Sequence, residues 1–252
     1  MIARARPLLG TLVSIRTDGD EEAVNHAFAL VAQAHRLMSA HSDEGDLARI
    51  NRLGHRRAVR VHPWTYRVLR TSRAVSRASD GAFDPTLGRG ATWEDIELLP
   101  GRKVRLARRA RLDLGGIAKG FAVDVAVAAL QKSGAAHGSV NAGGDLAIFG
   151  KRPQLVRVRV PGDPHQTVPL ARSRARAFAT SGSYFSDELV DPRDRRRLRI
   201  GHSITVSARS CMVADALTKA VAALGPQRAL LERFAAQAYL VDRHGTLHTP
   251  RG

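Results

Sequence analysis

The stretch LDLGGIAKGFAVDVA, residues 112–126, places an acid, two glycines and a lysine directly before a run of helical character. We interpret it as a strand that ends at Leu114, a turn of two glycines, and a helix that begins near Ile117. Glycines let a ligand approach the backbone closely, and free amide groups at the start of a helix favour an anion. Lys119 adds a positive charge there, and Asp113 can accept hydrogen bonds from a sugar or base. The stretch is therefore suited to a phosphate with a polar neighbour.

The same residues also fit a plain strand-to-helix turn that carries a surface lysine. They match neither G-x-x-x-x-G-K-[ST] nor G-x-G-x-x-G, which excludes the two common nucleotide-binding loops.

Outward from this stretch, strands and helices mix without a regular alternation, which favours the α+β class. Apolar residues at helical spacing predict helices, and alternating or short apolar runs predict strands. The predicted helices are 20–40, 65–81 and 212–225, and the predicted strands are 7–17, 106–115, the runs LVRVRVPG and RAFATSG, 202–208, a pair within 138–150 around Gly143-Gly144, and a hairpin around His244-Gly245.

The net charge of +17 suggests polyanions as partners, but only five of the 40 basic residues are lysine and the arginines are spread along the chain. Aromatic residues make up 5% of the chain, too few for the stacking surfaces of single-strand binders. No helix-turn-helix, zinc-finger or RNA-recognition signature is present. We therefore expect no specific nucleic-acid partner.

The apolar runs are too short and too interrupted to span a bilayer, so we expect no transmembrane segment. No apolar run of signal-peptide length lies near the start of the sequence, which favours a cytoplasmic location. A periplasmic or membrane-associated location stays open if a leader was removed. Cys211 is the only cysteine, so no internal disulfide can form.

Four further stretches share this style of small residues, and three of them also carry an acid. In ADALTKA, the side chains of Asp215, Thr218 and Lys219 share one helix face and could point at one ligand. Each stretch also has a plainer explanation, such as a turn, a hairpin or an Asp215–Lys219 surface salt bridge. The stretches are GAFDPTLG (81–88), NAGGDLAIFG (141–150), ATSGSYFS (179–186) and ADALTKA (214–220).

Taken together and in this order, the stretches resemble the ApbE family of FAD:protein FMN transferases, from about Arg6 to Gly225. The resemblance implies an α+β fold with antiparallel and mixed sheets flanked by helices. It implies one domain over residues 1–252, made of two closely packed subdomains with the cofactor cleft between them. The motifs that carry it are RPLLGTLVSI, MSAHSDEGDLARIN, GAFDPTLG, LDLGGIAKGFAVD, NAGGDLAIFG, ATSGSYFS, VDP and ITVSA…ADALTKAVAALG.

The activity that the resemblance implies is transfer of the FMN half of FAD, with Mg²⁺, to a threonine or serine hydroxyl of a partner flavoprotein. AMP is the leaving group. Two alternatives stay open: an FAD-binding protein without transfer activity, and an FAD diphosphatase that gives FMN and AMP.

The resemblance also assigns residues. The metal ligands would be the backbone carbonyl of Gly116 and the carboxylate of Asp215, together with the hydroxyl of Thr218 if it takes over the role of the family's threonine. The positions that match cofactor contacts are Ala82, Phe83, Asp84, Asp113, Lys119 and Val190. His41 stands where the family usually has a tyrosine that packs on the cofactor, and a histidine can stack there too.

Two departures from the family pattern concern catalysis. Lys219 stands where the family has a metal-binding threonine. Three arrangements are open: Thr218 takes over the hydroxyl role, Lys219 replaces part of the metal charge, or Lys219 turns outward. We expect metal binding to survive in modified form. Glu188 stands where the family often has a histidine, and we expect it to serve as the base for the incoming hydroxyl.

Overall fold

A computed structural model describes residues 1–182 and 189–249. Within these residues, an eight-stranded sheet forms the largest layer, and every neighbouring pair in it is antiparallel. In sheet order its strands are β1 (Ile2–Leu8), β2 (Thr11–Thr17), β6 (Gly138–Ala142), β7 (Asp145–Phe149), β10 (Arg176–Ser181), β11 (Ser203–Ala208), β12 (Gln237–Val241) and β13 (Leu247–His248).

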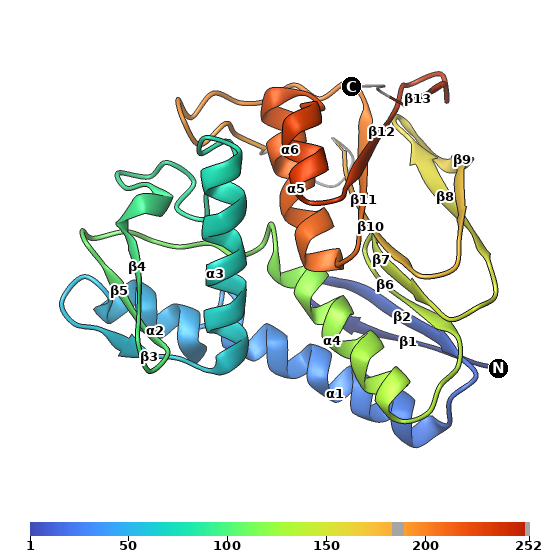
Figure 1. Ribbon diagram of the computed structural model, residues 1–252, viewed down its shortest axis with the longest axis horizontal. Helices are drawn as coiled ribbons and strands as arrows, with labels where there is room; N and C mark the ends of the chain where they lie inside the picture. The colour runs from blue at the N-terminus through green and yellow to red at the C-terminus, as the bar shows by residue number, and fades with distance from the viewer. Residues whose placement is uncertain (183–188, 250–252) are drawn as a thin grey trace.

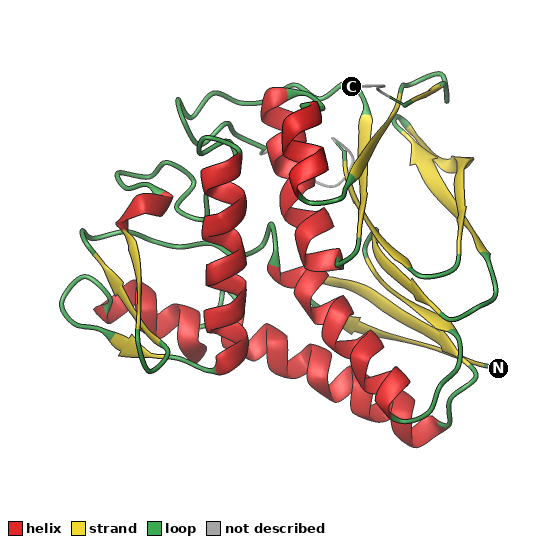
Figure 2. Cartoon of the chain, in the orientation of Figure 1, coloured by secondary structure: helices red, strands yellow, loops and turns green. Residues whose placement is uncertain are grey.

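One face of this sheet is covered by α1 (Glu21–Met38), α4 (Ala118–Lys132) and α5 (Cys211–Leu224), as Figure 1 shows. Beyond these helices lies a second layer of α2 (Gly45–Leu53), α3 (Pro63–Ala78) and a small antiparallel sheet. That sheet has the order β3 (Val59–Arg60), β5 (Lys103–Leu106) and β4 (Ile96–Leu99), and the 3-10 helix Trp93–Asp95 precedes β4. The helices therefore stand between two sheets (Figure 2).

The hairpin of β8 (Gln154–Val160) and β9 (Asp163–Ser173) lies beside the large sheet, away from the helices (Figure 1). Val156, Val158 and Val160 are buried while the residues between them are exposed, which is the period of two expected for a half-covered strand. These valines pack against Phe178 of β10 and Ile148 of β7, so a second small core holds the hairpin to the sheet.

Helix α5 is buried nearly all round because it contacts β10 and β11 on one side and α4 and α3 on the others. Its apolar residues include several alanines, which let the neighbours come close. Gly120 of α4 does the same, since a Cβ there would lie 2.3 Å from the carbonyl oxygen of Cys211. The first turns of α4 and α5 are thus held in direct contact, and the chemistry described below lies there. The chain ends its helical layer with the short α6 (Arg228–Arg233).

The sequence-based helix predictions are confirmed for α1, α3, α4 and α5, and the strand pair around Gly143-Gly144 is β6 and β7. Three strands, β10, β11 and β8, also match their predicted runs, and β12 and β13 form the expected closing hairpin. The α+β class is confirmed. All strand pairs in the described ranges are antiparallel, so the mixed sheets that the resemblance implied are not found there.

Two strand predictions are wrong. The run 7–17 is a hairpin of β1 and β2, because Leu9 and Gly10 both take positive φ and reverse the chain. The strand predicted over 106–115 ends at Leu106 in β5. Further along, the Asn51 side chain accepts from the Leu112 N–H at 2.8 Å and donates to its carbonyl at 3.0 Å. A side chain thus supplies the partners that a neighbouring strand would have given.

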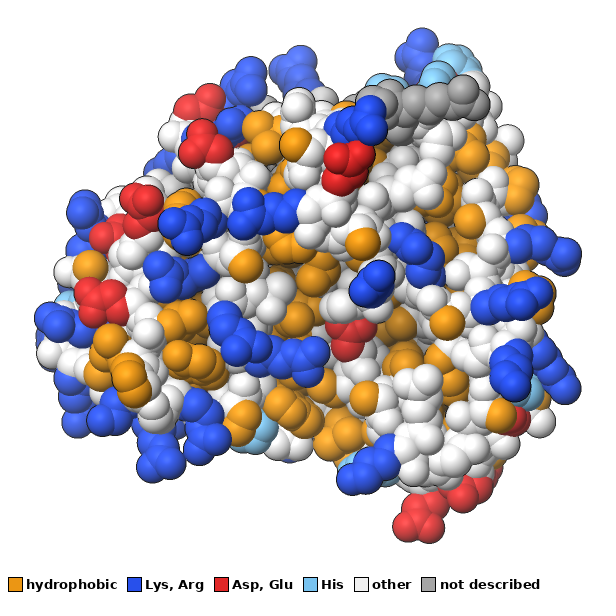
Figure 3. All heavy atoms as spheres, in the orientation of Figure 1, with side chains coloured by type: hydrophobic (Ala, Val, Ile, Leu, Met, Phe, Trp, Pro, Cys, Tyr) orange, Lys and Arg blue, Asp and Glu red, His pale blue; other side chains and the backbone are white. Residues whose placement is uncertain are grey.

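None of the helices in the described part of the chain is both long and apolar enough to cross a membrane. Lysine and arginine side chains are scattered over the face in Figure 3 rather than gathered in one patch.

Candidate functional site

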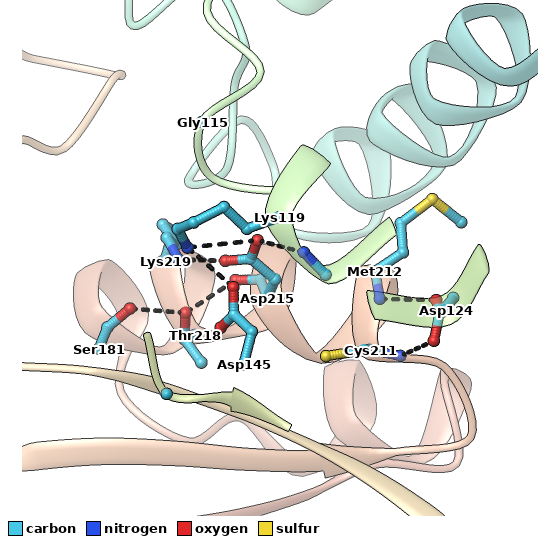
Figure 4. Close-up of polar contacts among 12 residues, drawn as sticks. Gly115, Lys119, Asp124, Asp145, Ser181, Cys211, Met212, Asp215, Thr218 and Lys219 are labelled. Carbon is cyan, nitrogen blue, oxygen red and sulfur yellow. Dashed lines mark hydrogen bonds and ion pairs between the residues drawn. The ribbon is translucent and has the colours of Figure 1, made fainter. Parts of the chain in front are cut away.

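Asp215 of α5 lies at the centre of a cluster of two acids and two lysines (Figure 4). Its side chain is 0% exposed. One oxygen, Oδ1, lies 2.5 Å from the Nζ of Lys219, one helical turn further along α5. The other, Oδ2, accepts from the backbone N–H of Gly120 at 3.2 Å and lies 3.8 Å from the Nζ of Lys119. The carboxylate therefore joins the first turn of α4 to the middle of α5.

Asp145, the first residue of β7, is the second acid of the cluster. Its side chain is 1% exposed, and its Oδ2 lies 2.8 Å from the Nζ of Lys119. The preceding Gly143 and Gly144 both have positive φ, and Gly144 donates to the side-chain oxygen of Asn141 at 3.0 Å. This turn brings the carboxylate beneath the start of α4.

The charges of the cluster shift one another's pKa values. Burial, and then the negative charge of Asp215, raise the pKa of Asp145 to about 6. Burial alone would raise the pKa of Asp215, but the ammonium groups of Lys119 and Lys219 hold it below its usual value. Burial would lower the pKa of Lys119, and Asp215 and Asp145 together raise it above its usual value instead. Lys119 is therefore firmly protonated, and its side chain is still 32% exposed.

Thr218 is buried beside the cluster, and its hydroxyl is engaged within the protein. Its Oγ1 donates to the backbone carbonyl of Asp215 at 2.7 Å and lies 2.8 Å from the Oγ of Ser181, at the end of β10. The hydroxyl pair links α5 to the sheet.

Gly116 lies between the cluster and the loop that carries Phe83. A Cβ added at Gly116 would lie 3.4 Å from the Phe83 ring and 3.5 Å from the Cε of Lys219. The Asp113 N–H donates to the carbonyl of Pro85 at 2.7 Å, and the Asp113 carboxylate accepts from the Gly115 N–H at 2.7 Å. The structure therefore brings three of the predicted segments together, at 81–85, 113–116 and 215–219.

Asp84 holds the shape of its own loop. Its buried carboxylate accepts from the backbone N–H of Thr86 at 2.7 Å and of Trp93 at 2.9 Å. Burial raises its pKa. At Gly88 the loop meets the segment 190–193. A Cβ added at Gly88 would lie 2.0 Å from the carbonyl oxygen of Pro192. Ala82 and Phe83 are also buried.

Other predicted residues lie further from the cluster or are not described. His41 is exposed in the connection from α1 to α2, and its backbone N–H donates to the Ser39 hydroxyl at 3.2 Å. Val190 is half-buried and forms an isolated β-bridge with Arg197. Glu188 lies outside the described residues, so its predicted role as a base has no structural counterpart here.

Two acids were not assigned to the site from the sequence. Asp145 directly follows the glycine pair Gly143-Gly144. Its pairing with Lys119 joins positions 26 residues apart, so no local pattern indicates it. Asp124 accepts from the Ser210 hydroxyl and from the N–H groups of Cys211 and Met212, at 2.7 to 3.0 Å, and so positions the start of α5. Across 1–182 and 189–249, no group of three or more His, Cys, Asp or Glu side chains could hold a metal ion.

Comparisons with known proteins agree with the fold. A family model described as the ApbE family matches residues 9–240. An FAD:protein FMN transferase of Rhodobacter capsulatus is 27% identical over 267 residues, which covers 87% of this chain and 51% of that protein. One of Vibrio cholerae is 25% identical over 244 residues, which covers 80% and 73%. The chain thus spans about half the length of the first relative.

Among solved structures, the ApbE protein of Thermotoga maritima superimposes with a TM-score of 0.85 at 24% identity, over 99% of this chain and 97% of that one. At this identity the likeness concerns the fold.

Proposed function

The chain belongs to the ApbE family, and from that premise we propose that it is an FAD:protein FMN transferase. The reaction moves the FMN half of FAD to a threonine or serine hydroxyl of an acceptor flavoprotein. The hydroxyl oxygen forms a new bond to the phosphorus of FMN, the bond from that phosphorus to the bridging oxygen breaks, and AMP leaves. FAD is the substrate and the acceptor protein is the partner.

The observation that carries the proposal is the position of Lys119. Its ammonium is held by two buried carboxylates, yet about a third of the side chain stays accessible beside the Gly115-Gly116 turn. Phosphoryl transfer depends mainly on positioning and on cations placed where negative charge gathers. This supports a role for Lys119 in binding the diphosphate of FAD and in stabilising the charge that develops on the AMP side.

The remaining predicted contacts belong to the same proposal. Asp113, just before the glycine turn, binds the organic part of the dinucleotide. Phe83 and Val190 provide apolar contacts to the cofactor. Asp84 acts by holding the 82–84 segment in shape, since both of its oxygens accept backbone N–H groups. His41 stacks on the cofactor, and Glu188 is the base that takes the hydroxyl proton. The site would lie between two subdomains of a single domain, residues 1–252.

The magnesium ion that the family implies does not fit the residues as they are arranged. Mg²⁺ requires several oxygen ligands at close to octahedral geometry. The proposed ligand Asp215 has an ammonium 2.5 Å from Oδ1 and an N–H bonded to Oδ2. The proposed ligand Thr218 donates its hydroxyl to a backbone carbonyl.

Transfer is tested by incubating the protein with FAD and a threonine-bearing acceptor domain, and by measuring released AMP and flavin covalently bound to the acceptor. The control is the same acceptor with its threonine changed to alanine. AMP with a flavinylated acceptor supports the proposal. AMP without labelling supports the diphosphatase, and bound FAD without AMP supports a binding protein that has lost transfer.

A further inference from the structure

We infer that the ammonium of Lys219 occupies the place of the divalent cation, so that this chain transfers FMN without bound magnesium. The inference rests on the proposed function and concerns the source of its positive charge. It follows from where the Lys219 side chain lies, from the charge balance around it, and from what it can still reach.

The Lys219 side chain points inward. Its Nζ lies 2.5 Å from a carboxylate that is 0% exposed, while its own side chain is 22% exposed. A solvated surface salt bridge, the plainer explanation of the Asp215–Lys219 spacing, would leave both groups in water. An outward-turned lysine is likewise inconsistent with this contact.

The Lys219 side chain also lies beside Gly116, the residue of the other expected metal ligand. Its Cε and Cγ would lie 3.5 and 3.6 Å from a Cβ at Gly116, whose carbonyl is the position assigned to the metal by the family resemblance. The stem of Lys219 thus runs along Gly116 and ends at Asp215. It therefore lies next to both residues that would share an ion.

The charges of the cluster are already balanced. The carboxylates of Asp145 and Asp215 face the ammonium groups of Lys119 and Lys219. Adding Mg²⁺ would place two more positive charges beside two ammonium groups in a largely buried site, where like charges repel strongly. Displacing Lys219 would first require breaking its contact with the buried Asp215.

An ammonium can perform the electrostatic part of the metal's task. It has three N–H donors, and only one is needed for Asp215. The others can donate to diphosphate oxygens from the exposed part of the side chain. With Lys119, it offers two ammonium groups that can donate hydrogen bonds to the substrate. Bond making and bond breaking are the same as in the proposed transfer.

The first test compares flavinylation of the acceptor by the unaltered protein in excess EDTA and in excess Mg²⁺. We expect rates equal within about twofold, whereas loss of a cation aimed at the transition state typically costs about 100-fold or more. A rate that collapses in EDTA and returns with Mg²⁺ overturns the inference.

The second test uses Lys219→Thr, which supplies a hydroxyl one position after Thr218 and removes the ammonium. We expect it to be inactive in EDTA and to gain at least about tenfold with Mg²⁺, because the acid is then free to bind the ion. Lys219→Met, which has neither charge nor hydroxyl, should stay slow in both conditions. Lys132→Met, at the exposed end of α4, is the matched control and should behave as the unaltered protein.

A third measurement does not depend on activity. Binding of Mn²⁺ to the protein without FAD is followed by electron paramagnetic resonance. We expect no saturable binding to the unaltered protein and saturable binding to Lys219→Thr, with folding of the variant checked by circular dichroism. If no transfer is seen under any condition, the proposed function fails, and this titration still decides the inference: saturable Mn²⁺ binding to the unaltered protein contradicts it.

Discussion

The carboxylate of Asp124, on α4, accepts the backbone N–H of Cys211, the first residue of α5, at 2.8 Å. Its other oxygen accepts the N–H of Met212 and the hydroxyl of Ser210. Because Lys119 stands on α4 and Lys219 and Asp215 on α5, this side chain helps to set how the two helices of the charged cluster face each other. Burial raises the pKa of Asp124, so these three donors offset part of the cost of its charge.

Replacing Asp124 with alanine should lower the free energy of unfolding by about 1–3 kcal/mol, because buried donors at the start of α5 lose their acceptor. Urea denaturation monitored by circular dichroism measures the change. Asp43→Ala, on an exposed loop, is the control and should shift the midpoint little. Equal midpoints for the two variants would show that Asp124 does not hold α5 in place.

Replacing Lys119 with methionine should lower the rate of AMP release about 100-fold, since it removes a cation from the developing charge. Binding of FAD should weaken as well, as followed by quenching of flavin fluorescence. The variant keeps the length of the apolar stem and leaves Asp145 without its partner, so its stability must be measured beside its activity. Lys151→Met, on an exposed turn, should change neither the rate of AMP release nor the binding of FAD. Equal rates for the two variants would contradict the role of Lys119.

Gly88 and Gly90 make a matched pair, because both have positive φ (63° and 75°) and stand two residues apart. A Cβ at Gly88 would lie 2.0 Å from the carbonyl oxygen of Pro192, whereas nothing lies within 4 Å of one at Gly90. Gly90→Ala should cost only the backbone strain, about 1 kcal/mol. Gly88→Ala should cost about 1–3 kcal/mol more through overpacking, and should weaken FAD binding by separating the 84–88 loop from the 190–193 segment.

That difference is measured by urea denaturation and FAD titration of both alanine variants. If both lose the same stability and bind FAD alike, the contact between Gly88 and Pro192 has no energetic importance.

The Asp191–Arg193 pair predicts a pH-dependent stability. Arg193 donates from Nε to Oδ1 at 2.9 Å and from Nη2 to Oδ2 at 2.6 Å, which lowers the pKa of Asp191 below its usual 3.8. A carboxyl with a lowered folded-state pKa contributes stability above its unfolded pKa and loses it as the pH falls through the folded value. Arg193→Ala should therefore cost about 1 kcal/mol at neutral pH, a small figure because the guanidinium is partly exposed and screened.

The cost of Arg193→Ala should shrink as the pH falls below 3.8, as measured by urea denaturation along a pH series. The exposed Arg89→Ala is the control and should show no such trend. A cost that stays constant into acid would mean that the ion pair does not stabilise the fold.

Local features of this chain could be predicted from its sequence because their causes are local. The start of α4 after two glycines, and the stop of α5 at Gly225, follow from backbone preferences of neighbouring residues. The same holds for the shared face of Asp215 and Lys219, which one helical turn brings together.

Partners far apart in the sequence could not be predicted in this way. The contact of Lys119 with Asp145 depends on how β7 lies beneath α4. Asn51 replaces a sheet neighbour for Leu112 across 61 positions, which is why an alternating run that looked like a strand is not one. Whether Lys219 points inward or outward is decided by the burial of Asp215, and no spacing reports that burial.

The one cysteine of the chain makes the packing of α5 against its neighbours observable by chemistry. The Cys211 thiol is completely buried, lies 3.7 Å from the carbonyl oxygen of Phe178, and has a pKa raised well above its usual value by burial. An alkylating reagent needs an exposed thiolate, so it can modify this residue only while α5 has moved away from its neighbours. The rate of alkylation therefore counts opening events at the base of the charged cluster. Its slowing by added FAD would report, without any mutation, how strongly the substrate holds the site closed.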